Sequence, residues 1–186
     1  TAKSIIPDPE DEKALVYTGP EDTAYNGTSQ MQPVTVKDPE TGKTLVEGSD
    51  YTISYSGDTT NVGKVTVTIT GIGDYSGTYE PAYQITPASL SVVTDSANKV
   101  YDGSALTAPG KITGLVNGET VTFTVTGTRT EVGESDNTYS LVWDGTALES
   151  NYTIGSESIG TLTVTAKSII PDPEDEKALV YTGPEN

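Results

Sequence analysis

The chain carries one stretch of sequence twice, and this duplication constrains its fold more than any other feature. The string TAKSIIPDPEDEKALVYTGPE occupies residues 1–21 and returns at residues 165–185, so residue 1 recurs at residue 165 and the period is 164 residues. Identity over such a length predicts units that recur in tandem, and a fold assigned without it would receive the wrong boundaries. We expect one whole repeat, followed in residues 166–186 by the start of the next identical repeat.

Composition favours small modules over one large core. Only 33 % of the 186 residues are hydrophobic, which suits two modules that each have a thin core. The chain has no cysteine, so disulfides and thiolate metal sites are excluded. It has no run of about 18 apolar residues, so membrane insertion is not expected. It also has no signal peptide or anchoring tail, as expected for an internal piece of a longer chain.

The chain is strongly acidic. Asp and Glu number 27 against 10 Lys and Arg, a formal charge of −17. This charge repels phosphate backbones and anionic lipid, so nucleic acid is not an expected partner. Repulsion between neighbouring modules would help to keep an array extended, although the charge could equally serve solubility alone.

Apolar residues alternate with Thr or Ser along most of the chain. The clearest runs are KVTVTIT at residues 64–70, TVTFTVT at 120–126 and GTLTVT at 160–165. A period of two places the apolar residues on one strand face, so these runs predict β-strands. Further strands are expected at residues 14–17, 33–37, 51–55, 79–86, 90–94, 138–143 and 152–154. Turns are expected at Asn26-Gly27, Thr41-Gly42, Asp102-Gly103, Asn117-Gly118 and Asp144-Gly145.

The repeat contains a second, more divergent duplication. Three landmarks occur in the same order in both halves: YNGT at residues 25–28 and YDGS at 101–104, TNVG at 60–63 and TEVG at 130–133, and DYS at 74–76 and NYT at 151–153. We therefore expect one β module over residues 1–87, with an exposed acidic, proline-rich segment at 7–12, and a second over residues 88–165. Trp143 is expected to anchor the core of the second module.

The predicted fold class is all-β, with two tandem small antiparallel modules in an elongated arrangement. No window has a convincing helical period. About seven short strands per module favour an Ig-like sandwich. A β-grasp-like sheet fits the same strands and remains the alternative.

The second half also carries family-like motifs. These are KVYDGS at residues 99–104, ITGLVNGE at 112–119, VGESDNT at 132–138, NYTI at 151–154 and GTLTVT at 160–165. Through these motifs, residues 89–165 resemble the MBG-type tandem repeat domains of Gram-positive bacterial surface adhesins. The first half resembles relatives in such proteins through YNGT, EGSDYT at 47–52 and NVG at 61–63. The resemblance implies a secreted or cell-wall-anchored adhesin, extracellular on the bacterial surface, whose Ig-like repeats form a stalk.

The residue types available exclude most catalytic sites. Without His or Cys the chain cannot form Ser-His-Asp, Cys-His or ordinary zinc sites. No pair of acids is marked as a glycosidase pair. The family that the chain resembles adds no catalytic or cofactor motif. We therefore expect no enzyme and no cofactor, and we assign no catalytic, cofactor-binding or metal residue.

Two minor hypotheses concern stabilising chemistry. Asp8, Glu10, Asp11 and Glu12 could offer oxygen ligands to calcium, although a solvated acidic loop explains them better because their spacing matches no calcium motif. An intramolecular Lys–Asn crosslink is the second hypothesis, and Lys99 with Asn151 is the least implausible pair for it.

Two functions remain open from the sequence. The first is a monomeric stalk or spacer, which projects a terminal binding domain from the cell wall and has adjacent identical repeats as its partners. The second is a repeat that itself binds host glycan or matrix protein through many weak contacts. Exposed aromatic residues would favour the second function, and the candidates are Tyr75, Tyr79 and Tyr83, although core packing explains the last two at least as well.

Overall fold

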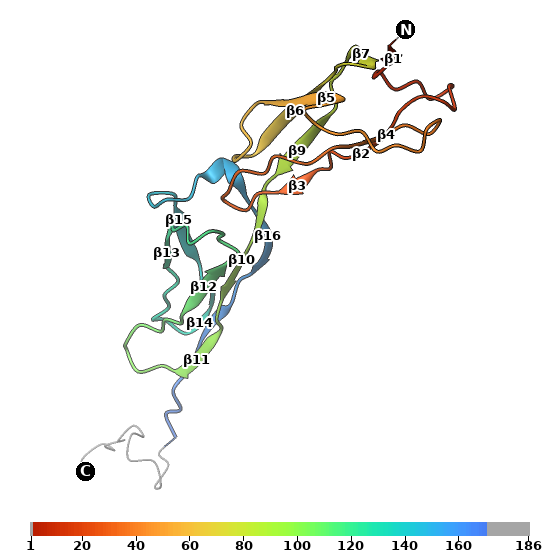
Figure 1. Cartoon of the computed structure of the whole chain (residues 1–186). Coiled ribbons are helices and arrows are strands. Elements are labelled where there is room, and N and C mark those ends of the chain that lie inside the picture. The colour runs from red at the N-terminus through yellow and green to blue at the C-terminus, as the bar shows by residue number, and fades with distance from the viewer. Residues whose placement is uncertain (1, 171–186) are drawn as a thin grey trace, which may run out of the picture. The chain divides into compact units, whose positions relative to one another are not determined.

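The computed structural model describes residues 2–170, and they fold as β-strands joined by turns (Figure 1). The single helical element in this range is a 3-10 turn at Glu149–Asn151, so the all-β prediction is confirmed. Within residues 2–170 no helix has the length and apolar character needed to cross a membrane. The chain divides into two compact units. Unit 1 comprises residues 2–89, 114–120 and 145–153, and unit 2 comprises residues 90–113, 121–144 and 154–170.

Unit 1 is built on β6 (Gly63–Gly71), the strand with the clearest sequence period. Its Val65, Val67 and Ile69 are fully buried, and the threonines between them are partly exposed, as alternation predicts. β5 (Tyr51–Ser56) pairs antiparallel with β6. β8 (Thr78–Tyr79) and β9 (Ala82–Thr86) also pair antiparallel with it, and β3 (Thr23–Ala24) joins β9 in parallel. The predicted strand at 79–86 is interrupted at Pro81, which has no N–H to give to a ladder.

The first copy of the duplicated segment belongs to the core of unit 1. β1 (Lys3–Ser4) pairs in parallel with β7 (Tyr75–Ser76), and β2 (Val16–Thr18) pairs antiparallel with β4 (Thr35–Lys37). Ile5 and Leu15 are buried beside these pairs. The Tyr17 hydroxyl donates a hydrogen bond to the Ile5 carbonyl, which ties the two ends of the segment together. The acidic segment between them is exposed, as predicted.

Unit 2 contains two three-stranded sheets and one strand pair. β10 (Ala88–Thr94) lies between β12 (Gly110–Thr113) and β16 (Tyr152–Ser158). β17 (Thr161–Thr165) pairs in parallel with β11 (Ala97–Val100) and antiparallel with β14 (Gly133–Asp136). β13 (Thr122–Val125) and β15 (Tyr139–Val142) form the remaining pair. The buried apolar side chains of this unit are Leu90, Val92, Leu162 and Val164.

One hydrogen-bonding pattern occurs in both units. In unit 1, Gly63 pairs with Ile85, and Tyr25 N–H donates to the Thr86 carbonyl at 2.8 Å. In unit 2, Gly133 pairs with Val164, and Tyr101 N–H donates to the Thr165 carbonyl at 2.8 Å. The strand orders β3-β9-β6 and β11-β17-β14 therefore correspond, with the first two of the three duplicated landmarks at equivalent positions.

The structure differs from the predicted modules in two details. Most strand pairs are antiparallel, as expected, but the sheets are mixed, because the parallel pairs β1–β7, β3–β9 and β11–β17 accompany the antiparallel ones. Most of these strands are only two to four residues long, too short to show a sequence period. Trp143 does not anchor a core: it is only partly buried, and the core of unit 2 is aliphatic.

Candidate functional site

A charged cluster surrounds Asp38 in unit 1. Lys3 Nζ donates hydrogen bonds to Asp38 Oδ1 at 2.7 Å and to Glu40 Oε2 at 3.0 Å, and Lys13 Nζ lies 3.2 Å from Glu40 Oε1. The Tyr75 hydroxyl donates to Asp38 Oδ2 at 3.4 Å. Asp38 is only 3 % exposed, so its carboxylate depends on these partners for stability.

The charges of this cluster suit a structural role. The hydrogen bond from Lys3 lowers the pKa of Asp38, and this effect outweighs burial, which alone would raise that pKa. Burial alone would lower the pKa of Lys3, but hydrogen bonds to Asp38 and Glu40 raise it overall. Both groups are therefore charged at neutral pH, whereas a catalytic acid or base works with a pKa near the working pH. The cluster holds the duplicated segment against the hairpin that follows β4.

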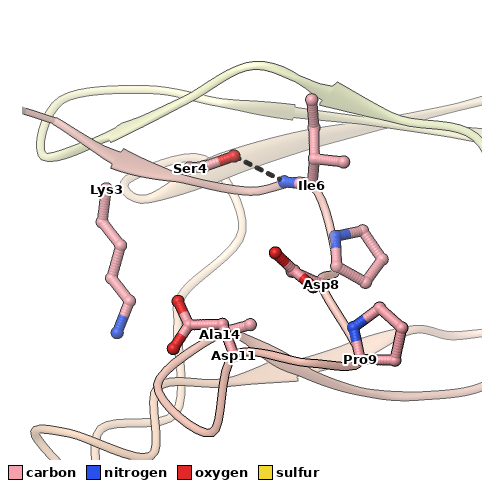
Figure 2. A pocket seen from close by; sticks show the side chains of 8 residues that line it. Lys3, Ser4, Ile6, Asp8, Pro9, Asp11 and Ala14 are labelled. Carbon is pink, nitrogen blue, oxygen red and sulfur yellow. Dashed lines mark hydrogen bonds between the residues drawn. The ribbon is translucent and has the colours of Figure 1, made fainter.

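A hollow of about 390 Å³ lies beside this cluster (Figure 2). The chain curves around it from Lys3 and Ser4 through Pro9 to Asp11 and Ala14. Ser4 Oγ accepts a hydrogen bond from the Ile6 N–H at 3.2 Å, which fixes the chain where it leaves β1. Every lining residue belongs to the first copy of the duplicated segment.

The acids proposed as calcium ligands support turns of their own loop. Asp8 Oδ1 accepts a hydrogen bond from Glu10 N–H at 3.0 Å, and Asp11 Oδ1 accepts one from Lys13 N–H at 2.9 Å. Among residues 2–170 no group of three or more acidic side chains is placed to hold a metal ion. The loop geometry follows from these side chain to backbone bonds.

A second cluster joins the separate segments of unit 1. The hydroxyls of Tyr25 and Tyr152 donate to the two carboxylate oxygens of Glu119, at 2.5 and 2.6 Å. The two rings meet edge to face with centroids 5.5 Å apart. Burial, and then the hydrogen bond to Glu119, raises the pKa of Tyr152 to about 12. Both phenols are neutral donors at physiological pH, and the carboxylate is their shared acceptor.

Asparagines complete this cluster. Asn151 is fully buried, with its Nδ2 donating to Asn61 Oδ1 at 2.7 Å and its Oδ1 accepting from Val62 N–H at 3.0 Å. Asn117 has a positive φ of 51° and donates from Nδ2 to the Gly27 carbonyl at 2.9 Å. Segments 114–120 and 145–153 are thus fastened to residues 25–62 by specific polar bonds.

The proposed crosslink pair has other partners. Lys99 Nζ donates to Asp102 Oδ1 at 2.6 Å and to Ser104 Oγ at 2.8 Å, and the Asn151 amide bonds Asn61 and Val62. The hydrogen bond from Lys99 is the main cause of a lowered pKa at Asp102. Nothing in this geometry poises Lys99 to attack an amide.

The candidate aromatic surface is largely core. Tyr75 and Tyr83 are buried, and the Tyr83 hydroxyl donates to the Gln30 carbonyl at 2.5 Å. Tyr79 is partly exposed and lies 4.7 Å from Tyr17, centroid to centroid. In the register, Tyr79 and Tyr83 stand opposite buried residues of β6, so they share its core face.

Sequence reasoning found part of this arrangement. The three landmarks contain Tyr25, Asn61, Asn151 and Tyr152, but sequence reasoning did not predict that these side chains meet in one cluster. Glu119 and Asp38 were missed, because each is one acid among 27 and only long-range contacts distinguish it.

No protein-family model and no curated protein matches this chain.

Proposed function

We propose that the chain is a structural repeat of a bacterial cell-surface adhesin, a stalk or spacer that projects a terminal binding domain away from the cell wall. The observation that carries this proposal is the structural role of the first duplicated segment. Its Ile5 and Leu15 lie in the core of unit 1, and its Lys3 neutralises buried Asp38. A sequence copied without change between repeats is therefore a piece of scaffold.

Strand connections support the same function. β9 ends at Thr86 and β10 begins at Ala88, so Pro87 alone separates them. β17 ends at Thr165, where the second copy of the duplicated segment begins. Short connections of this kind suit a stalk, because repeats that follow one another directly give length in proportion to copy number.

The polar and aromatic clusters in residues 2–170 favour a structural role over the binding of a ligand. The polar clusters around Asp38 and Glu119 are satisfied by their own side chains. The tyrosines that would have favoured a glycan-binding repeat face the core instead. No specific contact favours the multivalent binding function.

X-ray scattering from chains of one, two and three repeats tests the proposal. A stalk predicts a maximum dimension that grows almost linearly with repeat number. A matched variant with a Gly-Ser linker inserted between Thr165 and Ala166 should grow as the square root of repeat number, because flexible chains do. Square-root growth of the unmodified chains would count against a stalk. A glycan and matrix-protein array probed with three repeats checks the binding alternative.

A further inference from the structure

Two Asn-Gly dipeptides meet in unit 1. Asn26-Gly27 and Asn117-Gly118 lie in adjoining turns, and a Cβ placed on Gly27 would come within 2.5 Å of Asn117 Cβ. An asparagine followed by glycine loses its side-chain amide most readily, because a glycine without Cβ leaves its backbone nitrogen open to react. The sequence ranks the two sites equally, and the structure distinguishes them.

The Asn26 side chain is held in the position that this reaction needs. Its Oδ1 accepts hydrogen bonds from the Thr28 N–H at 2.9 Å and from the Thr28 hydroxyl at 2.8 Å. Because a backbone N–H can only donate, the acceptor is the amide oxygen. The bond to the Thr28 N–H folds the side chain forward over the Gly27 peptide. Asn26 and Thr28 are both exposed, so water and hydroxide reach them.

We propose that Asn26 is a site of spontaneous deamidation and isomerisation, with water as co-reactant. The Gly27 N–H gives its proton to hydroxide and the nitrogen attacks Asn26 Cγ, so that an N–Cγ bond forms and negative charge moves onto Oδ1. The Cγ–Nδ2 bond then breaks, and Nδ2 takes a proton from water and leaves as ammonia. Water opens the resulting succinimide ring at either carbonyl, which leaves aspartate or isoaspartate at position 26.

Thr28 assists the attack. Both of its donors point at Oδ1, the atom on which negative charge develops. A hydrogen bond to a charged oxygen is about twice as strong as one to a neutral oxygen, so these donors stabilise the tetrahedral intermediate more than the starting amide. Thr28 thereby supplies the two donors of an oxyanion hole.

Asn117 is held against the same reaction. Its φ of 51° and the Gly118 φ of 70° place both residues in a tight left-handed turn. Its Nδ2, the atom that would have to leave, donates to the Gly27 carbonyl at 2.9 Å. Donation from Nδ2 strengthens the conjugation of the amide and makes Cγ a poorer target. Asn117 therefore stays intact while Asn26 reacts.

The corresponding turn of unit 2 already contains the aspartate product. Asp102 aligns with Asn26, and its Oδ1 accepts hydrogen bonds from the Ser104 N–H at 2.9 Å and the Ser104 hydroxyl at 2.8 Å. Lys99 Nζ lies 2.6 Å from this carboxylate, whereas Thr23 stands at the equivalent position of unit 1. An aspartate at position 26 thus keeps the turn, without a neighbouring cation.

Isoaspartate has a different consequence. It lengthens the main chain by one carbon immediately before Gly27, where Asn117 leaves no spare room. The Gly27 carbonyl then moves away from Asn117 Nδ2, and the hydrogen bond that fastens segment 114–120 to this turn is lost. Isomerisation at position 26 therefore loosens unit 1 as the protein ages, whether or not the protein is a stalk.

Peptide mapping of the full chain tests the site. The chain is kept for several weeks at mildly alkaline pH, folded or in concentrated urea, and mass spectrometry then follows the exchange of ammonia for water in each Asn-Gly peptide. In the folded chain Asn26 should react at least about 10-fold faster than Asn117, because two donors assist it. In urea the two rates should be similar. An intact Asn26, or an Asn117 that reacts as fast in the folded chain, would overturn the proposal.

Thr28→Val tests the assisting hydroxyl. Valine keeps the branched shape and the backbone N–H, so the folded variant should react about 5-fold more slowly at Asn26, the worth of one hydrogen bond. In urea, where the turn is absent, the substitution should change nothing. An unchanged rate in the folded chain, or equal slowing in urea, would refute the role of Thr28.

Hydrogen exchange tests the consequence for segment 114–120. The isoaspartate fraction of aged chain is separated by chromatography and compared with Asn26→Asp, which has the charge without the extra main-chain carbon. Amides of residues 114–120 should exchange faster in the isoaspartate fraction and at the original rate in Asn26→Asp. Equal exchange in these two chains would contradict the proposed loosening.

Discussion

Replacing Tyr152 by Phe removes one hydroxyl from the cluster that fastens the segments of unit 1. That hydroxyl donates to Glu119 Oε2 at 2.6 Å and accepts from the Val116 N–H at 3.2 Å. A hydrogen bond to a charged group contributes about 1.5 to 3 kcal/mol, and a neutral one about 1 kcal/mol. Because the two bonds share one oxygen and are not additive, we expect the free energy of unfolding to fall by about 2 to 3 kcal/mol.

The chain contains a matched control. The Tyr139 hydroxyl donates to Glu157 Oε1 at 2.6 Å, so it makes the same kind of bond, but in an exposed setting. Water replaces that hydroxyl as the donor to the exposed Glu157 carboxylate, so Tyr139→Phe should destabilise the chain by only about 0.5 kcal/mol.

Urea denaturation followed by circular dichroism measures both variants. The slope of unfolding free energy against urea should be unchanged, so that the midpoint alone reports stability. A double-mutant cycle with Glu119→Gln should give a coupling energy of at least about 1 kcal/mol for Tyr152. Equal effects of Tyr152→Phe and Tyr139→Phe would refute the claim that this cluster fastens segments 114–120 and 145–153.

Three further predictions follow from other groups. The pKa of Asp38 is lowered, chiefly by its hydrogen bond from Lys3. The stability that this carboxylate provides is therefore present above about pH 4 and is lost as pH falls through its folded-state pKa. Lys3→Met should reduce the free energy of unfolding by about 2 kcal/mol at pH 7 and weaken its fall at acid pH, both measured by urea denaturation. Asn137 is fully buried, and its side-chain amide donates to the Asp95 and Ala108 carbonyls at 2.9 and 3.1 Å. Asn137→Ala should therefore lower the melting temperature and reduce the free energy of unfolding by about 2 to 3 kcal/mol. As a control, Asn98→Ala on the exposed face of β11 should change it by less than about 0.5 kcal/mol. The acidic segment 7–12 should bind no structural calcium, so calorimetric melting temperatures with calcium and with chelator should agree; a clear rise with calcium would revive that site.

The long strands were predictable because period and burial agree in them. β6 has three apolar residues on one face and threonine on the other, and the structure buries the predicted face. Four of the five predicted glycine turns have the positive φ that Gly supplies. In the fifth, at Gly145, a side chain would meet the backbone of Thr120 instead.

The short parallel strands and polar clusters were not predictable. β1 is two residues long, and its pairing depends on Tyr75, which lies far away in the sequence. Asp38 resembles any surface acid until Lys3 is brought beside it. Long-range contacts of this kind leave no local period, so sequence alone indicated the existence of strands but not which distant segments would meet.

Surface display tests the stalk proposal most directly. A binding domain of known ligand would be carried at a bacterial surface on one, two or three copies of the 164-residue repeat, and the height of bound ligand above the wall would be measured by localisation microscopy. The stalk account predicts equal increments of height for each added repeat. Heights that stay constant, or that increase only as the square root of copy number, would contradict it.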